Sequence, residues 1–232
     1  MTFTELREKS RRQSDYIITL FVTNEVSLIL TWLLLKANVT PNQVTFASML
    51  CGLFAGVGYA VGWFLIGSLL LFLSHVLDCT DGNLARAQGK SSSYGKWLDL
   101  VGDRVTEVSV FFGAGINLYR NEMSYEWVLL TLLALLFIIL YYYVVDIGLA
   151  IGFSERQQRV TAFKLKSVHI KWGLLEPVLY GFIVLAPLGL VKVQIVMISI
   201  LSVLGLVYQV YRNYSYIESM PKGHKEIDLS NK

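Results

Sequence analysis

The chain has 232 residues, of which 54% are hydrophobic and 16% are charged, and its formal net charge is +3. In soluble globular domains about a quarter of the residues are charged, so this composition excludes an ordinary soluble domain and indicates an integral membrane protein. At about 20 residues per spanning helix, the length fits about six spans with short connections and excludes a sizeable soluble domain beside them.

Residues 1–40 are expected to form a cytoplasmic amino-terminal segment. The first twenty residues are polar and basic, whereas a cleavable signal peptide needs an apolar core, so the first spanning helix is expected to direct insertion. Residues 24–36 (NEVSLILTWLLLK) are apolar but too short to cross about 30 Å of hydrocarbon. We therefore expect them to form an interfacial amphipathic helix.

The apolar segments that follow predict an all-α membrane domain at residues 41–215, with a cytoplasmic tail at 216–232. Thr40 as N-cap and Pro41 at the first helical position mark the start of the first span. The predicted spans are 41–62, 63–86, 94–119, 125–152, 172–190 and 191–213. The third is the least apolar, because it contains Lys96, Asp99, Asp103, Arg104 and Glu107.

The distribution of basic residues predicts the orientation. With the amino terminus in the cytoplasm, seventeen of the twenty Lys and Arg residues lie at the cytoplasmic side, only Arg120 and Lys192 lie in the opposite loops, and Arg104 lies inside a span. This asymmetry follows the positive-inside rule. Both termini, and the acidic stretch after the second apolar segment, are therefore expected at the cytoplasmic face.

Four aspartates lie in that stretch, DCTDGNLARAQGKSSSYGKWLDLVGD at residues 78–103. Asp78 and Asp81 are three apart on one helix and Asp99 and Asp103 four apart on the next, so each pair shares a helix face. Two antiparallel helices joined by a short loop would bring all four together. Ionised carboxylates at membrane depth cost several kcal/mol each, so a cation must neutralise them. Oxygen ligands alone favour Mg²⁺ or Mn²⁺ over zinc.

His75 and the two cysteines are left out of this ligand set. His75 lies one turn before Asp78, but a lone histidine on a helix is more often a hydrogen-bonded residue than a metal ligand. Cys51 and Cys79 fall inside apolar segments without CxxC spacing, so we interpret them as packing residues.

Small and basic residues near the aspartates indicate a phosphate ligand. Gly82, Ala85 and Gly95 let a bulky anion approach the backbone, and Arg86 supplies a bidentate donor for phosphate oxygens. Asn42, near the start of the first span, would add a helix-terminus anion site. These features predict a diphosphate site where metal neutralises charge and a base deprotonates an attacking hydroxyl.

The run Asp78-x2-Asp81-Gly82-x2-Ala85-Arg86-x8-Gly95-x3-Asp99-x3-Asp103 resembles the complete signature of the CDP-alcohol phosphotransferase family. The resemblance covers about residues 38–215 in hydropathy pattern, and Pro41-Asn42-x2-Thr45 is similar to the family's usual start of its first span. The serine loop at 91–93 and the Asp103-Arg104 pair are most similar to members that make inositol-phosphate or glycerophosphate diesters.

The resemblance implies a role for each motif residue. Asp78, Asp81, Asp99 and Asp103 would hold two Mg²⁺ or Mn²⁺ ions that bind the diphosphate of a CDP-linked donor. Asp103 would also act as general base on the acceptor hydroxyl, whose attack on the β-phosphorus releases CMP. The residues expected to contact CDP are Asn42, Asp81, Gly82, Ala85, Arg86, Gly95 and Asp99. The family also implies a homodimer with a cytoplasm-facing cavity.

The acceptor contacts are expected among basic residues: Arg104, Arg156, Arg159 and Lys164. The last three follow the fourth span, where a positive-inside loop at the lipid headgroups is the favoured interpretation. Arg104 needs an anionic partner, either an acceptor phosphate or a carboxylate such as Glu107 or Asp146.

The donor is expected to be CDP-diacylglycerol or a related CDP-lipid, with the interfacial helix as a wall for its acyl chains. The alternative is a water-soluble CDP-alcohol such as CDP-inositol. Both belong to phospholipid or phosphodiester biosynthesis, with a hydroxylated polar acceptor, membrane lipids and a second copy of the chain as partners, and no nucleic acid.

Two other classes of protein fit less well. An ion- or proton-coupled transporter also contains intramembrane carboxylates, but it predicts polar residues in several spans and an internal repeat, whereas the carboxylates here cluster within residues 78–103. An aspartate-rich prenyl transferase would need a second aspartate-rich motif on a distant helix, which this sequence lacks.

Overall fold

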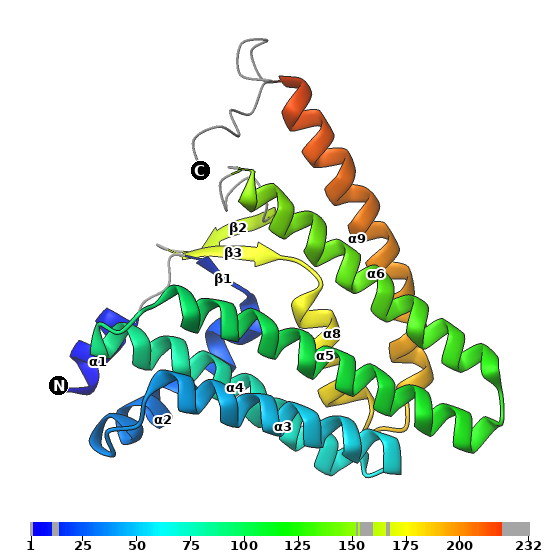
Figure 1. Ribbon diagram of the computed structural model, residues 1–232, viewed down its shortest axis with the longest axis horizontal. Coiled ribbons are helices and arrows are strands. Elements are labelled where there is room, and N and C mark those ends of the chain that lie inside the picture. Colours follow the sequence, from blue (N-terminus) through cyan, green and yellow to red (C-terminus); the bar gives the residue numbers. More distant parts are fainter. Residues whose placement is uncertain (1, 11–13, 152, 154–159, 166–167, 220–232) are drawn as a thin grey trace.

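The computed structural model describes residues 2–10, 14–151, 153, 160–165 and 168–219, most of them in helices (Figure 1). The helices are α1 (Phe3–Lys9), the π-helical turn η1 (Thr19–Thr23), α2 (Asn24–Lys36), α3 (Pro41–Val61), α4 (Phe64–Gln88), α5 (Ser93–Glu122), α6 (Tyr125–Ala150), α8 (Leu175–Leu185) and α9 (Val191–Ser219). Three short strands, β1 (Ser14–Asp15), β2 (Val160–Leu165) and β3 (Val168–Trp172), form one sheet.

Among the described residues, five helical stretches are long and apolar enough to cross a membrane: Thr19–Lys36, Pro41–Val61, Phe64–Gln88, Tyr125–Ala150 and Val191–Ser219. Large apolar side chains point away from the bundle on these helices, including Phe54, Leu69 and Leu136. An exposed apolar surface of this kind is what lipid covers in a membrane protein. The prediction of a helical integral membrane protein is confirmed at this level.

The amino-terminal helix is longer than expected. Residues 24–36 continue the π-helical turn at 19–23, so that one helical stretch of 18 residues results. The helical segment is therefore longer than residues 24–36 alone, because residues 19–23 are helical as well, and its length no longer excludes a crossing.

The predicted span at 172–190 was also wrong in its extent. Trp172 ends strand β3, and α8 is a helix of 11 residues. The helix ends before Pro187, which has no backbone N–H to donate, and Gly189 then takes a left-handed φ of 75°. By contrast α5, the predicted charged span at 94–119, is a continuous helix of 30 residues, or about 45 Å at 1.5 Å per residue.

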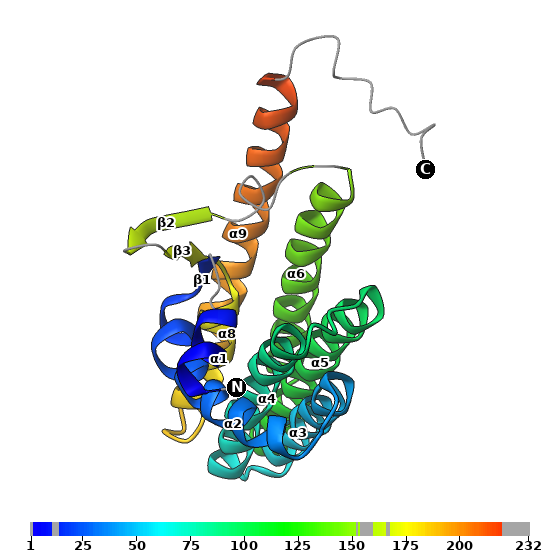
Figure 2. The same cartoon turned by 90° about the vertical axis from the view of Figure 1, so that its left-hand side faces the viewer.

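The all-α prediction missed the three strands. β1 pairs parallel with β3, and β2 pairs antiparallel with β3. Residues after α6 that we expected as a loop therefore contain a strand pair, and the alternation of apolar and polar residues in VTAFKL and VHIKW suits strands. Figure 2 shows the sheet to one side of α9 and α6. Through β1, the amino-terminal segment joins residues more than 150 positions later in the sequence.

Helices α3 and α5 approach each other very closely. A Cβ added at Gly113 of α5 would lie 2.0 Å from the carbonyl oxygen of Gly56 on α3. Small residues permit such backbone contact between membrane helices. The start of α3 is confirmed, since Pro41 is its first residue and the side chain of Gln43 accepts a 2.9 Å hydrogen bond from the backbone N–H of the N-cap Thr40.

Phe182 joins the short helix α8 to the core. The hydroxyl of Tyr59 on α3 lies 2.9 Å from that of Ser68 on α4 and donates to the carbonyl of Phe182 at 3.3 Å. The Phe182 ring meets Phe111 of α5 edge-on, with ring centroids 5.2 Å apart. Helices α3, α4, α5 and α8 are therefore held around one interior, and the acidic ends of α4 and α5 open into it.

Candidate active site

Helices α4 and α5 are antiparallel and are joined by residues 89–92, where Gly89 ends α4 with a left-handed φ of 64°. This connection brings three of the predicted aspartates into one group. Asp78, Asp81 and Asp99 each present a carboxylate oxygen, and these atoms lie within 4.8 Å of one another. Carboxylates this close repel unless a cation is shared between them. The donor set is all oxygen and fits Mg²⁺ or Mn²⁺.

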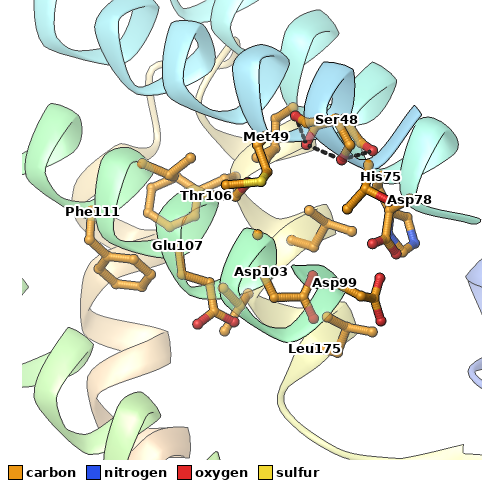
Figure 3. A pocket seen from close by; sticks show the side chains of 18 residues that line it. Ser48, Met49, His75, Asp78, Asp99, Asp103, Thr106, Glu107, Phe111 and Leu175 are labelled. Atoms are coloured by element: carbon orange, nitrogen blue, oxygen red, sulfur yellow. Dashed lines mark hydrogen bonds between the residues drawn. The ribbon is translucent and has the colours of Figure 1, made fainter. Parts of the chain in front are cut away.

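Asp103 lies one turn further along α5. It lines a cavity together with Asp78 and Asp99, and Figure 3 shows the three carboxylates on one side of this cavity and Phe111 on the other. Asp103 is not a member of the group within 4.8 Å. Its predicted roles as fourth ligand and as general base stay predictions.

The cavity is acidic on one side and apolar on the other. Leu71, Val178 and Phe182 line it, and these side chains come from α4 and α8. Apolar walls beside a carboxylate group strengthen electrostatic interactions within the site, because they keep the local dielectric low.

A second cavity, lined mainly by polar residues and glycines, adjoins the carboxylates. All seven residues expected to contact CDP line it: Asn42, Asp81, Gly82, Ala85, Arg86, Gly95 and Asp99. Thr45 and Asp99 line both cavities. The carboxylates therefore stand where a polar pocket and an apolar one meet. That each residue contacts CDP stays a prediction.

Thr45 takes part in the site in a way that the sequence did not indicate. Its hydroxyl donates to the carboxylate of Asp81 at 2.5 Å and lies 3.2 Å from the carbonyl of Pro41. The first turn of α3 is thereby attached to the carboxylate group on α4. The only sequence signal was the spacing of Pro41, Asn42 and Thr45, which puts Thr45 one turn into the helix.

Arg86 is oriented by a chain of buried polar groups. Its Nη2 donates to the side-chain carbonyl of Asn83 at 2.6 Å, and the amide of Asn83 donates to the hydroxyl of Ser27 on α2 at 2.9 Å. A Cβ at Gly82 would lie 3.4 Å from the Arg86 guanidinium, so a larger side chain there would crowd it. Asn83 is fully buried. A polar amide in the interior of helix α4 is the sequence signal that indicates this hydrogen-bonded chain.

Arg104 is paired with a carboxylate on its own helix. Its Nη1 lies 2.6 Å from Glu107 Oε2, and its guanidinium lies 4.0 Å from the centroid of the Tyr142 ring on α6. The sequence left three anionic partners open for Arg104: an acceptor phosphate, Glu107 or Asp146. In the structure Arg104 pairs with Glu107. Glu107 also lines the acidic side of the cavity with Asp103.

No described contact joins the other residues predicted to bind the acceptor to the carboxylates. Arg156 and Arg159 lie outside the described residues, and Lys164 lies in strand β2. Contact between these three residues and an acceptor stays a prediction.

An all-oxygen ligand group between a basic, glycine-lined pocket and an apolar cavity, in a helical membrane protein, suits metal-dependent phosphoryl transfer. The profile of the CDP-alcohol phosphatidyltransferase family matches residues 38–211, and the chain belongs to this family. The resemblance drawn from the aspartate run is confirmed. The protein transfers a substituted phosphate group from a CDP-linked donor to a hydroxyl acceptor, with a divalent metal as cofactor.

Several known proteins are similar to the chain. Archaetidylinositol phosphate synthase of Pyrococcus horikoshii is 26% identical over 190 residues, which are 80% of this chain and 89% of that protein. Phosphatidylinositol phosphate synthase of Cutibacterium acnes is 33% identical over 105 residues, which are 45% of this chain and 51% of that protein, so this match spans about half of the relative. The crystal structure of Mycobacterium tuberculosis phosphatidylinositol phosphate synthase with CDP-DAG bound has a TM-score of 0.67 at 20% identity, covering 88% of this chain and 98% of that one, and shows the same fold.

Proposed function

We propose that the protein transfers a phosphatidyl-type group from CDP-diacylglycerol, or a related CDP-lipid, to a phosphorylated polyol such as inositol phosphate, and releases CMP. The observation that carries this proposal is the position of the carboxylates between a polar and an apolar cavity, with Asp99 and Thr45 lining both. A lipid donor needs both environments, because its nucleotide is polar and its acyl chains are not. Relatives named as inositol phosphate synthases support the acceptor class.

The reaction forms one bond and breaks one. The acceptor's hydroxyl oxygen bonds to the β-phosphorus of the donor, the bond from this phosphorus to the CMP oxygen breaks, and CMP leaves with the bonding electrons. Asp103 takes the hydroxyl proton. Asp78, Asp81 and Asp99 would hold the divalent metal, which would neutralise charge on the diphosphate. Arg86, at the polar cavity, binds phosphate oxygens of the donor.

The lipid assignment has further support from α2. This helix packs against α4, and Ile29 and Leu33 on its outer face are half exposed. An apolar helix face of this kind would line the path of acyl chains into the bilayer. The amino-terminal stretch 19–36 is proposed to lie at the interface for this purpose rather than to span.

The acceptor is proposed to bind beside Arg104. Its side chain is 30% exposed, and a guanidinium has five N–H donors, so the ion pair with Glu107 leaves donors for a phosphate. Arg156, Arg159 and Lys164 are proposed as additional contacts for that phosphate. A phosphorylated acceptor suits this site better than a neutral polyol because its phosphate oxygens would accept from the N–H donors of Arg104 that Glu107 does not use.

We propose that residues 41–215 cross the membrane six times, with both termini and the active site in the cytoplasm. We also propose that the protein is a homodimer. The excess of basic residues at one side supports the orientation. Helix α5 is long enough to cross. Helix α8 has 11 residues, so the crossing that it begins would be completed by the residues that follow it, up to Leu190.

The test is CMP release by the purified protein in detergent or vesicles. CDP-diacylglycerol, CDP-inositol, CDP-glycerol and CDP-choline are each offered with inositol phosphate, inositol or glycerol phosphate. We expect CMP release from CDP-diacylglycerol with a phosphorylated acceptor, and a lipid product that incorporates labelled acceptor. Turnover confined to a water-soluble donor would overturn the lipid-donor proposal, and turnover confined to unphosphorylated inositol would overturn the acceptor proposal.

A further inference from the structure

We infer that the π-helical turn η1 belongs to the active site: Thr19, acting through His75, is a positioning residue for the carboxylate of Asp78. This inference rests on the proposed role of Asp78 as a metal ligand. Residues 19–23 precede the region matched by the family profile, which begins at residue 38. A part of the chain outside the matched region would thus control the geometry of the metal group.

His75 is the link between the two parts. It lies on α4 one turn before Asp78, is 9% exposed and lines the acidic cavity. A ring nitrogen of His75 and a carboxylate oxygen of Asp78 lie within 4.8 Å of each other, in a group that also contains the Cys79 sulfur. Figure 3 shows the imidazole beside the Asp78 carboxylate. The ring is therefore close enough to limit the orientations that Asp78 adopts.

The orientation of the imidazole depends on residues far away in the sequence. Its Nε2 lies 3.3 Å from the hydroxyl of Thr19, in a buried hydrogen bond. The Tyr180 ring of α8 meets it edge-on, with ring centroids 5.9 Å apart and an interplanar angle of 86°. The hydrogen bond to Thr19 and the contact with the Tyr180 ring together restrict rotation of the imidazole. The edge of the ring nearest Asp78 is therefore held in place.

Thr19 is itself held from α8. One carboxylate oxygen of Glu176 accepts hydrogen bonds from the backbone N–H groups of Ile18 at 2.5 Å and of Thr19 at 3.0 Å. At the other end of the turn, the Thr23 hydroxyl lies 2.5 Å from the phenol of Tyr180. A π-helical turn is rare and is frequently found at functional sites. Here it presents a threonine hydroxyl to the histidine beside the metal group.

The expected consequence concerns metal affinity. Removal of a residue that orients a metal ligand lowers the metal affinity or the activity by about 10–100-fold. Loss of the Thr19 hydroxyl would free the imidazole and, through it, Asp78. We expect the folded bundle to remain, because Thr19 lies in the short amino-terminal turn η1 and not in the long helices α3, α5 and α9.

The experiment measures Mn²⁺ binding to the full-length protein in detergent, without substrate, by titration calorimetry or by the electron paramagnetic resonance signal of free Mn²⁺. Thr19→Val keeps the shape of the side chain and removes its hydroxyl, and Thr19→Ser restores the hydroxyl. His75→Phe keeps the ring against Tyr180 and removes both nitrogens. The matched control is Thr31→Val, because Thr31 is equally buried but its hydroxyl donates to the carbonyl of Ser27 within α2 at 2.7 Å.

We expect Thr19→Val and His75→Phe to raise the Kd for Mn²⁺ by about tenfold or more, while Thr19→Ser and Thr31→Val bind as the wild type does. A Kd for Thr19→Val equal to that of the wild type would overturn the inference, as would an equal weakening in Thr31→Val. Thr19→Val decides the matter even if His75→Phe does not fold. A wild-type protein that binds no Mn²⁺ would instead contradict the proposed metal site.

Discussion

The hydroxyl of Thr45 donates a 2.5 Å hydrogen bond to the carboxylate of Asp81 and so connects the first turn of α3 to the metal group on α4. A hydrogen bond to a charged group contributes about 1.5–3 kcal/mol. Because Thr45 lines both cavities, this one contact helps to fix the point at which the polar and apolar pockets meet.

The first prediction follows from that contact. Thr45→Val keeps the side-chain volume and removes the donor, so Asp81 loses a fixed orientation. We expect the Mn²⁺ concentration for half-maximal activity to rise about tenfold or more, as the range of hydrogen-bond energies implies, and Thr45→Ser to restore it. An unchanged metal dependence in Thr45→Val would show that the bond does not orient the ligand.

The second prediction concerns the contact between α3 and α5. Gly113→Ala places a Cβ 2.0 Å from the Gly56 carbonyl oxygen, so the helices must separate. Overpacking of this kind costs about 1–3 kcal/mol, and the midpoint of thermal unfolding in detergent should fall. Gly115→Ala on the same helix is the control, because its Cβ would meet Thr131 at 3.6 Å, an ordinary contact. Equal midpoints for the two variants would contradict the packing described.

The third prediction separates the two roles considered for Arg104. Arg104→Gln leaves Glu107, whose side chain is 11% exposed, without its cation. Breaking a buried ion pair from one side costs about 3–5 kcal/mol, whereas replacing both partners is often near neutral. Stability should therefore fall in Arg104→Gln and recover in Arg104→Gln with Glu107→Gln.

The KM for the acceptor then shows whether Arg104 also binds substrate. If it contacts the acceptor phosphate, the double variant regains stability but keeps a raised KM for a phosphorylated acceptor. A double variant with both stability and KM at wild-type values would limit Arg104 to the ion pair.

The fourth prediction tests the orientation and the crossing of α5. Lys90 precedes α5 and Met123 follows it, and both side chains are exposed. A cysteine at Lys90→Cys should react with an impermeant thiol reagent only from the cytoplasmic side, and one at Met123→Cys only from the opposite side. Reaction of both from one side would mean that α5 does not span the membrane.

The metal group was predictable because its residues are close in sequence and follow helical spacing. Asp78 and Asp81 share a face of α4. The short connection at 89–92 makes α5 run back along α4, which places Asp99 opposite them. The same reasoning predicted the start of α3 from Thr40 and Pro41. Local spacing and a short loop therefore sufficed for the part of the site that α4 and α5 carry.

Other features depend on tertiary contacts that no local pattern encodes. Thr19 and His75 are 56 residues apart, and neither belongs to a motif. The strand pair β2–β3 is joined by the distant β1, and hydropathy could not distinguish the apolar start of α8 from the end of a strand. The extent of that span was therefore wrong although its apolar character was correct.

The structure supports metal-dependent transfer from a CDP-linked donor, and we propose Asp103 as the base. This mechanism is tested most directly by CMP release from CDP-diacylglycerol, measured for the wild type with Mn²⁺, for the wild type after chelation with EDTA, and for Asp103→Asn, each beside a CDP-binding assay. We expect chelation to stop turnover and added Mn²⁺ or Mg²⁺ to restore it. Asp103→Asn should lower turnover by about 10²-fold or more, the usual worth of a general base, while CDP still binds. Turnover that survives chelation, or that stays at the wild-type rate in Asp103→Asn, would contradict the account.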